Sequence, residues 1–210
     1  MKNYLVEFIG TFFLVLVIGL SVVDAGAGAL APLAIGSVLM VMVYAGGHIS
    51  GAHYNPAVTL AVWMRGKCAS KDVVPYMAAQ IAAAIVAALI VNYFKSGAPV
   101  NPSTPEVAKA LLNEFFFTFA LAYVVLNVAT SSKTAGNSYY GLAIGFTVAA
   151  AAFAGGAISG GAYNPAVAVG ITTMGLSSIG NIWIFLVANF IGGAVAATVF
   201  KIVNPEEYQK

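Results

Sequence analysis

The sequence predicts an all-α membrane protein with six transmembrane helices and two re-entrant half helices, arranged as an inverted internal repeat. Three observations indicate this fold. Of the 210 residues, 60% are hydrophobic and 8% are charged, whereas soluble domains carry roughly 25% charged residues. Residues 49–58 (ISGAHYNPAV) return, slightly altered, at 158–167 (ISGGAYNPAV), 109 positions later. Each copy leads into an apolar run that is too short to cross a bilayer.

Six other stretches are long and apolar enough to span a membrane, which takes about 20 residues. They are residues 4–23, 30–47, 73–94, 107–128, 139–156 and 181–203. The first of them contains Glu7 and is not followed by a convincing small-residue cleavage site. We therefore expect a membrane span at this position rather than a cleavable signal peptide.

Each half helix is expected to begin at an Asn-Pro-Ala tripeptide. Asparagine is a favoured N-cap, and proline is preferred at the first helical position. The apolar runs that follow cover residues 58–64 and 167–174. The two tripeptides consist of Asn55, Pro56, Ala57, Asn164, Pro165 and Ala166. Half-length helices in matching places of two halves indicate a site near the membrane midplane.

The duplication extends beyond these phrases. Residues 33–36 (LAIG) recur at 142–145 with the same offset of 109, and Glu7 with Thr11 returns as Glu114 with Thr118. Since three spans per copy is an odd number, the second copy must insert upside down relative to the first.

The domain organisation follows from this duplication. We expect one domain over residues 1–210, with repeat 1 at about 1–95, a linker at about 95–106 and repeat 2 at about 107–210. The linker is rich in proline, serine and asparagine and is expected to be a surface connector without chemistry of its own.

Basic residues indicate the orientation in the membrane. Six crossings place both termini on one side, and seven of the nine basic residues then share that side. They are Lys2, Arg65, Lys67, Lys71, Lys133, Lys201 and Lys210. Both termini are therefore expected in the cytoplasm. The net charge of +2 gives no basis for nucleic-acid binding.

Six spans, two Asn-Pro-Ala boxes and the intramembrane acids Glu7 and Glu114 together resemble the aquaporin family, the major intrinsic proteins. The resemblance covers the whole chain. It implies a passive channel for water and small neutral solutes, without enzymatic activity or cofactor, embedded in lipid as a homotetramer. It also implies that both acids accept hydrogen bonds from re-entrant backbone. From the residues alone, a proton-relay pair in a coupled transporter is the alternative.

The electrostatics of two meeting half helices also favour a channel between them. Two helix N-termini that meet at the midplane each present a partial charge of about +0.5, which repels protons and other cations. Amide groups of Asn55 and Asn164 are expected to donate hydrogen bonds to a passing water. The non-helical approaches are expected to line the path with carbonyl oxygens. They comprise Gly51, Ala52, His53, Tyr54, Gly160, Ala162 and Tyr163.

The chain departs from the family at the selectivity filter. Most members continue the second box with an arginine that narrows the outer mouth, whereas this chain has Val167. The other filter positions fall by spacing on Ile35, Ala152 and the Gly161 backbone. This combination predicts a wide, apolar filter and a weaker barrier to cations.

Two alternatives stay open at this stage. One is a facilitator mainly for ammonia, urea or glycerol-type solutes, and the other is a non-conducting junctional or scaffold protein with the channel fold. An intramembrane hydrolase is unsupported because Ser50 and Ser159 lack partners for a catalytic triad. The only two histidines, His48 and His53, have no acid suited to complete a metal site, and none is expected.

Overall fold

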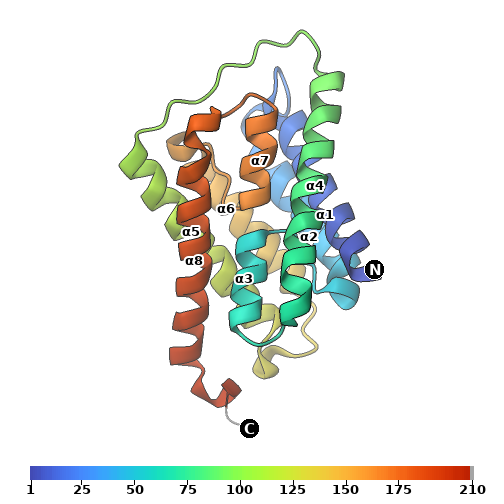
Figure 1. Cartoon of the computed structure of the whole chain (residues 1–210), viewed down its shortest axis with the longest axis vertical. Coiled ribbons are helices and arrows are strands. Elements are labelled where there is room, and N and C mark those ends of the chain that lie inside the picture. The colour runs from blue at the N-terminus through green and yellow to red at the C-terminus, as the bar shows by residue number, and fades with distance from the viewer. Residues whose placement is uncertain (209–210) are drawn as a thin grey trace.

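The computed structural model describes residues 1–208, which fold into eight α-helices joined by short turns and one longer linker (Figure 1). The helices are α1 Lys2–Val22, α2 Ala31–Ser50, α3 Pro56–Met64, α4 Ser70–Phe94, α5 Val107–Ala129, α6 Tyr140–Ser159, α7 Pro165–Thr173 and α8 Ile182–Val203. Six of them are long and apolar enough to cross a membrane. The exceptions are α3 and α7, with nine residues each.

The long helices agree with the predicted spans to within one or two residues, except that α4 begins three residues earlier and that α2 and α6 each end three residues later. Gly51 and Gly160 end these helices with φ angles of 86° and 98°. This left-handed conformation costs glycine little and stops the helix. Both helices therefore end at the glycines of the repeated phrase rather than at the predicted residues 47 and 156.

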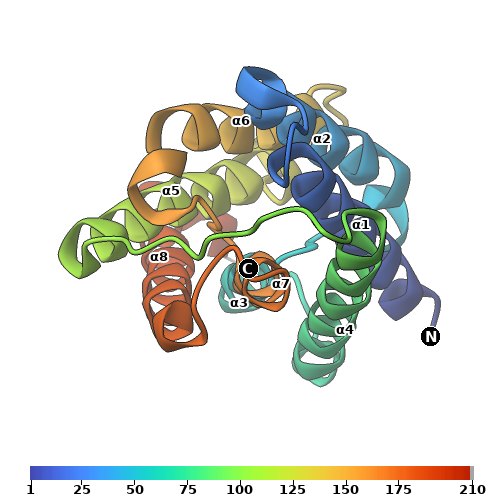
Figure 2. The same cartoon turned by 90° about the horizontal axis from the view of Figure 1, so that it is seen from above.

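Helix packing repeats between the two halves. In the first half α1 packs against α2 and α4, and in the second half α5 packs against α6 and α8 in the same way. The halves join where α2 meets α6, where α4 meets α7 and where α3 meets α8. Figure 2 shows the two short helices one above the other between α8 and α4. Both half helices therefore pack mainly between α4 and α8.

Two glycines permit the close crossing of α2 and α6. A Cβ atom on Gly145 would lie 2.4 Å from the carbonyl oxygen of Gly36, and one on Gly36 would lie 2.6 Å from that of Gly145. Both glycines come from the repeated LAIG segment. Small residues at such crossings let helix backbones approach closely in lipid.

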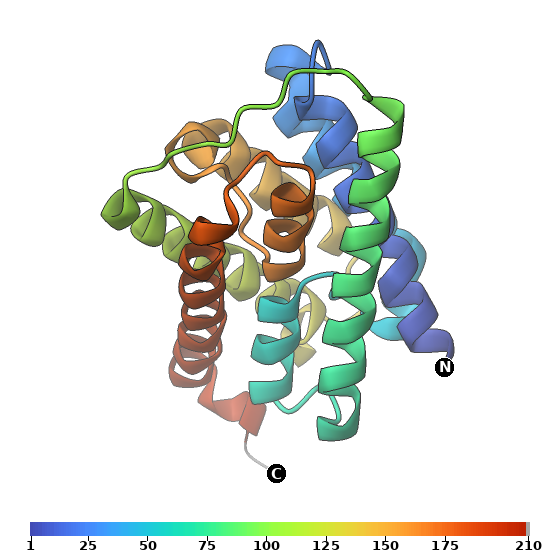
Figure 3. The same cartoon turned by 45° about the horizontal axis from the view of Figure 1, so that its top comes forward.

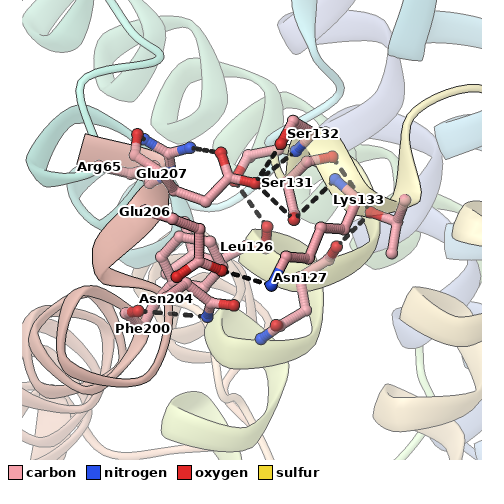
Figure 4. Close-up of polar contacts among 12 residues, drawn as sticks. Arg65, Leu126, Asn127, Ser131, Ser132, Lys133, Phe200, Asn204, Glu206 and Glu207 are labelled. Atoms are coloured by element: carbon pink, nitrogen blue, oxygen red, sulfur yellow. Dashed lines mark hydrogen bonds and ion pairs between the residues drawn. The ribbon is translucent and has the colours of Figure 1, made fainter. Parts of the chain in front are cut away.

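A set of polar contacts, here called the C-terminal lock, ties the chain end to both repeats (Figure 4). It consists of Arg65, Ser131, Ser132, Glu207 and Tyr208. Arg65 follows α3 and pairs with Glu207 at 2.6 Å, its guanidinium 4.7 Å from the centre of the Tyr208 ring. Glu207 also accepts hydrogen bonds from the Ser131 hydroxyl at 2.8 Å and from the Ser132 N–H at 2.6 Å. The lock therefore connects α3, the α5–α6 loop and the segment after α8.

We expect the lock to make stability depend on pH only below about pH 5. Hydrogen bonds from the Ser131 and Ser132 hydroxyls, together with the Arg65 charge, lower the pKa of Glu207 from 4.5 to about 2. A carboxylate with a depressed folded pKa stabilises the fold fully above its unfolded pKa, and this contribution disappears as pH falls through the folded value. The melting temperature of wild type should exceed that of Glu207→Gln by a constant amount from pH 7 to about pH 5 and converge with it toward about pH 2.

Thermal unfolding in detergent, followed by circular dichroism, measures this difference. Glu206→Gln is the matched control, because Glu206 pairs with Lys133 but its side chain is 42% exposed. Its effect at pH 7 should be smaller than that of Glu207→Gln. A gap between wild type and Glu207→Gln that closes already above pH 5 would contradict the assignment of the low pKa to this side chain.

Candidate functional site

A buried carboxylate from α1 holds the first non-helical segment in place. Glu7 is fully buried and accepts four hydrogen bonds. The donors are the Ser50 hydroxyl at 2.7 Å, the His53 N–H at 2.9 Å, the Tyr54 N–H at 2.7 Å and the Gln80 side-chain amide at 2.8 Å. Four donors satisfy an ionised carboxylate, which has no donor of its own. Glu7 thereby anchors the backbone that leads to Asn55.

Glu114 makes the matching contacts in the second half. It is also fully buried and accepts from the Ser159 hydroxyl at 2.6 Å, the Ala162 N–H at 2.9 Å and the Tyr163 N–H at 2.6 Å. Asn113 adds a contact that the first repeat lacks, donating to the Ser159 hydroxyl at 2.7 Å. Both anchored segments therefore depend on one intramembrane acid each.

The anchored segments contain residues in the left-handed backbone region. Tyr54 and Tyr163 both have φ of 49°, and Ala52 has φ of 51° where the second repeat has Gly161. Such conformations cost a non-glycine residue about 1–3 kcal/mol and persist only where surrounding contacts hold them. Within residues 1–208, the carbonyl oxygens of 51–53 and 160–162 accept no hydrogen bond from the protein. They are free to accept one from another molecule.

Both half helices begin at a capping asparagine. The side-chain oxygen of Asn55 accepts from the N–H groups of Ala57 and Val58 at 2.9 and 3.4 Å. Asn164 caps α7 through the corresponding two N–H groups at the same distances. Each oxygen is therefore used by its own helix, as N-capping requires.

The same two asparagines bind the repeats to each other. The amide nitrogen of Asn55 donates to the carbonyl of Tyr163, and that of Asn164 donates to the carbonyl of Tyr54, both at 2.9 Å. These reciprocal bonds bring the N-termini of α3 and α7 together. An amide nitrogen carries two hydrogens, so one hydrogen of each asparagine stays available.

A cavity of about 290 Å³ lies beside these N-termini. All four predicted filter positions line it, along with both asparagines and six of the seven predicted loop residues. These residues are Ile35, Ala152, Gly161, Val167, Asn55, Asn164, Ala52, His53, Tyr54, Gly160, Ala162 and Tyr163. Gly51 lies outside the cavity. Pro56, Ala57, Pro165 and Ala166 are buried in the first turns of the half helices and do not line it either.

The cavity differs from the sequence expectation at the linker. Ser103, in the stretch expected to be a connector without chemistry, is among the lining residues. Hydropathy and turn signals describe the linker correctly as non-helical, but they carry no information on what it covers. The sequence also yielded no prediction for Asn113, which supports the second anchored segment through Ser159. Its position next to the intramembrane acid Glu114 was the only signal for this role.

Comparison with known proteins identifies the family. The model of the family described as major intrinsic protein matches residues 1–200. The chain belongs to the major intrinsic protein family. The name Aquaporin NIP1-4 is given to a relative from Oryza sativa subsp. japonica that is 36% identical over 213 residues, covering 97% of this chain and 77% of the relative.

Other major intrinsic proteins match over a similar length. A Lactiplantibacillus plantarum relative named glycerol uptake facilitator protein-like 6 is 35% identical, covering 99% of this chain and all of the relative. The aquaglyceroporin from Plasmodium falciparum has a similar structure, with a TM-score of 0.80 at 22% identity over 98% of both chains. The family is one of membrane channels, and the predicted fold of six spans and two re-entrant helices is confirmed.

Proposed function

We propose that this protein is a passive membrane channel for water and small neutral solutes, whose path runs through the cavity and between the N-termini of α3 and α7. One observation carries the proposal: Asn55 donates to the Tyr163 carbonyl, and Asn164 donates to the Tyr54 carbonyl. Through these two hydrogen bonds the N-termini of α3 and α7 meet, and each N-terminus carries a partial charge of about +0.5. Protons and other cations are repelled there, while the remaining amide hydrogens can donate to a neutral solute.

The free backbone carbonyls continue this path on both sides of the asparagines. Residues 51–53 approach from one repeat and residues 160–162 from the other, and no donor within residues 1–208 bonds to either set of carbonyls. Unpaired carbonyls are tolerated at membrane depth where they face water. Glu7 and Glu114 serve this path as anchors, since every described contact of their carboxylates is with a donor of the surrounding structure.

A wide filter that admits solutes larger than water is the form of the channel best supported here. Val167 is 3% exposed and faces the cavity together with Ile35 and Ala152. None of these side chains is charged or can donate a hydrogen bond. The names of the relatives include both an aquaporin and a glycerol uptake facilitator. We infer that glycerol and urea pass beside water.

The remaining expectations extend this proposal. Both termini lie in the cytoplasm by the distribution of basic residues, which places the linker outside the cell. The chain forms homotetramers with one pathway per subunit, as the family resemblance implies. A non-conducting scaffold has less support, because a scaffold does not need two anchored segments with free carbonyls.

Reconstituted vesicles test the proposed function directly. Light scattering after an osmotic step should show water permeability well above that of empty vesicles, and glycerol and urea gradients should show faster re-swelling. A proton gradient monitored by an internal dye should persist. Folded protein that conducts no solute would overturn the channel and favour the scaffold.

A further inference from the structure

We propose that Ser103 is a specificity-determining residue at the outer mouth, where its hydroxyl replaces hydrogen bonds that a polar solute loses on leaving water. The inference rests on the proposed channel function and adds to it a residue from the linker. It also defines the class of solute that benefits, namely molecules with hydroxyl or amide groups, such as glycerol and urea.

The linker is held across the cavity by its backbone. Figures 1 and 2 show it crossing the end of the bundle between α4 and α5, over the region of α7. The Ser103 N–H donates to the Leu176 carbonyl at 3.0 Å, and the Ser103 carbonyl accepts from the Asn181 side chain at 3.4 Å. Ser103 also pairs with Ser177 as an isolated parallel bridge. Both backbone groups of Ser103 are therefore fixed to the α7–α8 connection.

The side chain of Ser103 is left free by these contacts. Its oxygen lies 3.8 Å from the position that a Cβ atom on Gly160 would occupy, which places it beside the second anchored segment. Among the described residues, no hydrogen-bond partner of this hydroxyl is found. A free hydroxyl both donates and accepts, so it suits alcohols and amides alike.

The Ser103 hydroxyl is a polar group in a largely apolar part of the cavity wall. Figure 3 shows the linker beside the connection from α1 to α2 and the end of α7. The cavity side chains contributed by α1, α2, α7 and the loop after α7 are apolar, and they include Val22, Ala31, Pro32, Ile35, Val167, Ile171 and Leu176. Polar side chains of the cavity besides Ser103 belong to the anchored segments and their asparagines. A solute that arrives from the linker side thus meets the Ser103 hydroxyl before it reaches the asparagines.

The energetic effect follows from the apolar mouth. A polar solute sheds water there, and the carbonyls of 160–162 can only accept hydrogen bonds, so one hydroxyl that both donates and accepts changes its barrier measurably. Since a typical hydrogen bond contributes a net effect worth about fivefold in rate, Ser103→Ala should lower glycerol and urea permeability about fivefold. Water is smaller and keeps more of its hydrogen bonds to neighbouring waters in a single-file column. Its permeability should therefore fall less than about twofold.

Two sets of variants in proteoliposomes test the inference. In the first, glycerol, urea and water permeabilities are compared for wild type, Ser103→Ala, Ser103→Thr and Thr104→Ala. Thr104 is the matched control because it is exposed on the same linker and does not line the cavity. We expect Ser103→Thr to retain glycerol and urea flux, since it keeps the hydroxyl, and Thr104→Ala to match wild type.

The second set tests whether residue 103 faces the solute path, independently of the hydrogen bonds that its side chain makes. Cys68 is the only cysteine, so Cys68→Ser provides a thiol-free background for Ser103→Cys and Thr104→Cys. Both are treated with a bulky charged methanethiosulfonate before reconstitution. The treated Ser103→Cys protein should lose solute flux, and the treated Thr104→Cys protein should retain it.

The outcomes separate this inference from the proposed function. A conducting wild type with unchanged solute selectivity in Ser103→Ala, or with full flux in the treated Ser103→Cys protein, overturns the role of Ser103 and leaves the channel intact. A wild type that conducts nothing overturns the channel, and the inference is lost with it.

Discussion

Replacing Val167 with arginine is expected to abolish glycerol and urea flux while leaving water flux measurable. Val167 lies in the first turn of α7, its side chain is 3% exposed, and it lines a cavity of about 290 Å³. An arginine there extends a long side chain toward Ile35 and Ala152 and adds a fixed positive charge. We expect glycerol and urea permeabilities to fall at least about tenfold, since a narrower constriction excludes the larger solutes first. Stopped-flow light scattering of reconstituted vesicles measures each permeability separately.

Val167→Met is the control that separates width from charge. Methionine fills part of the same space without a charge or a donor, so it should reduce glycerol flux less than arginine does. Arginine alone should also lower any leak of cations, because its charge repels them. Equal glycerol permeability in wild type and a folded Val167→Arg protein would show that the narrowest point of the path lies elsewhere.

Features coded by neighbouring residues were predictable from the sequence. Asn55 and Pro56 carry a local signal for a helix start, and α3 begins at Pro56 as this signal predicts. The same reasoning predicted the start of α7 at Pro165. The predicted bounds were less accurate at the start of α4 and at the ends of α2 and α6. There the left-handed glycines decide where each helix stops.

Features that depend on distant residues were not predictable in the same way. The bond from Asn55 to the Tyr163 carbonyl joins positions 108 residues apart, and it requires that two inverted repeats meet at one depth. The sequence indicated that the half helices meet, but not that one amide hydrogen of each asparagine is used to join them. Glu207 offers an even weaker signal, because it is one of two adjacent acids near the chain end, and such residues normally lie in solvent.

The position of the linker over the candidate site was likewise not predictable from the sequence. Its composition correctly excludes a helix, but the position of Ser103 over the cavity depends on backbone bonds to Leu176 and Asn181. No pattern within the linker specifies those partners. A long connection between repeats is nevertheless where functional residues often lie, since a rigid scaffold positions it.

Removing the Glu114 carboxylate is expected to cause a larger loss of stability than removing the Glu207 carboxylate. Glu114→Ala leaves the Ser159 hydroxyl and the N–H groups of Ala162 and Tyr163 without their acceptor. Each unsatisfied buried donor costs about 1–3 kcal/mol, and three of them approach the whole stability of an ordinary protein, about 5–15 kcal/mol. We expect little or no folded Glu114→Ala protein on size-exclusion chromatography in detergent.

Glu114→Gln distinguishes an anchor from a proton relay. Glutamine keeps the shape, but its NH₂ group donates where the site needs an acceptor, so the variant should be clearly destabilised and partly misfolded. A relay carboxylate would instead give a stable Glu114→Gln protein that has lost only proton-coupled transport. Glu106→Gln is the matched control, since the Glu106 side chain is 57% exposed and pairs with the exposed Lys109. That variant should fold and melt like wild type, because exposed ion pairs contribute little.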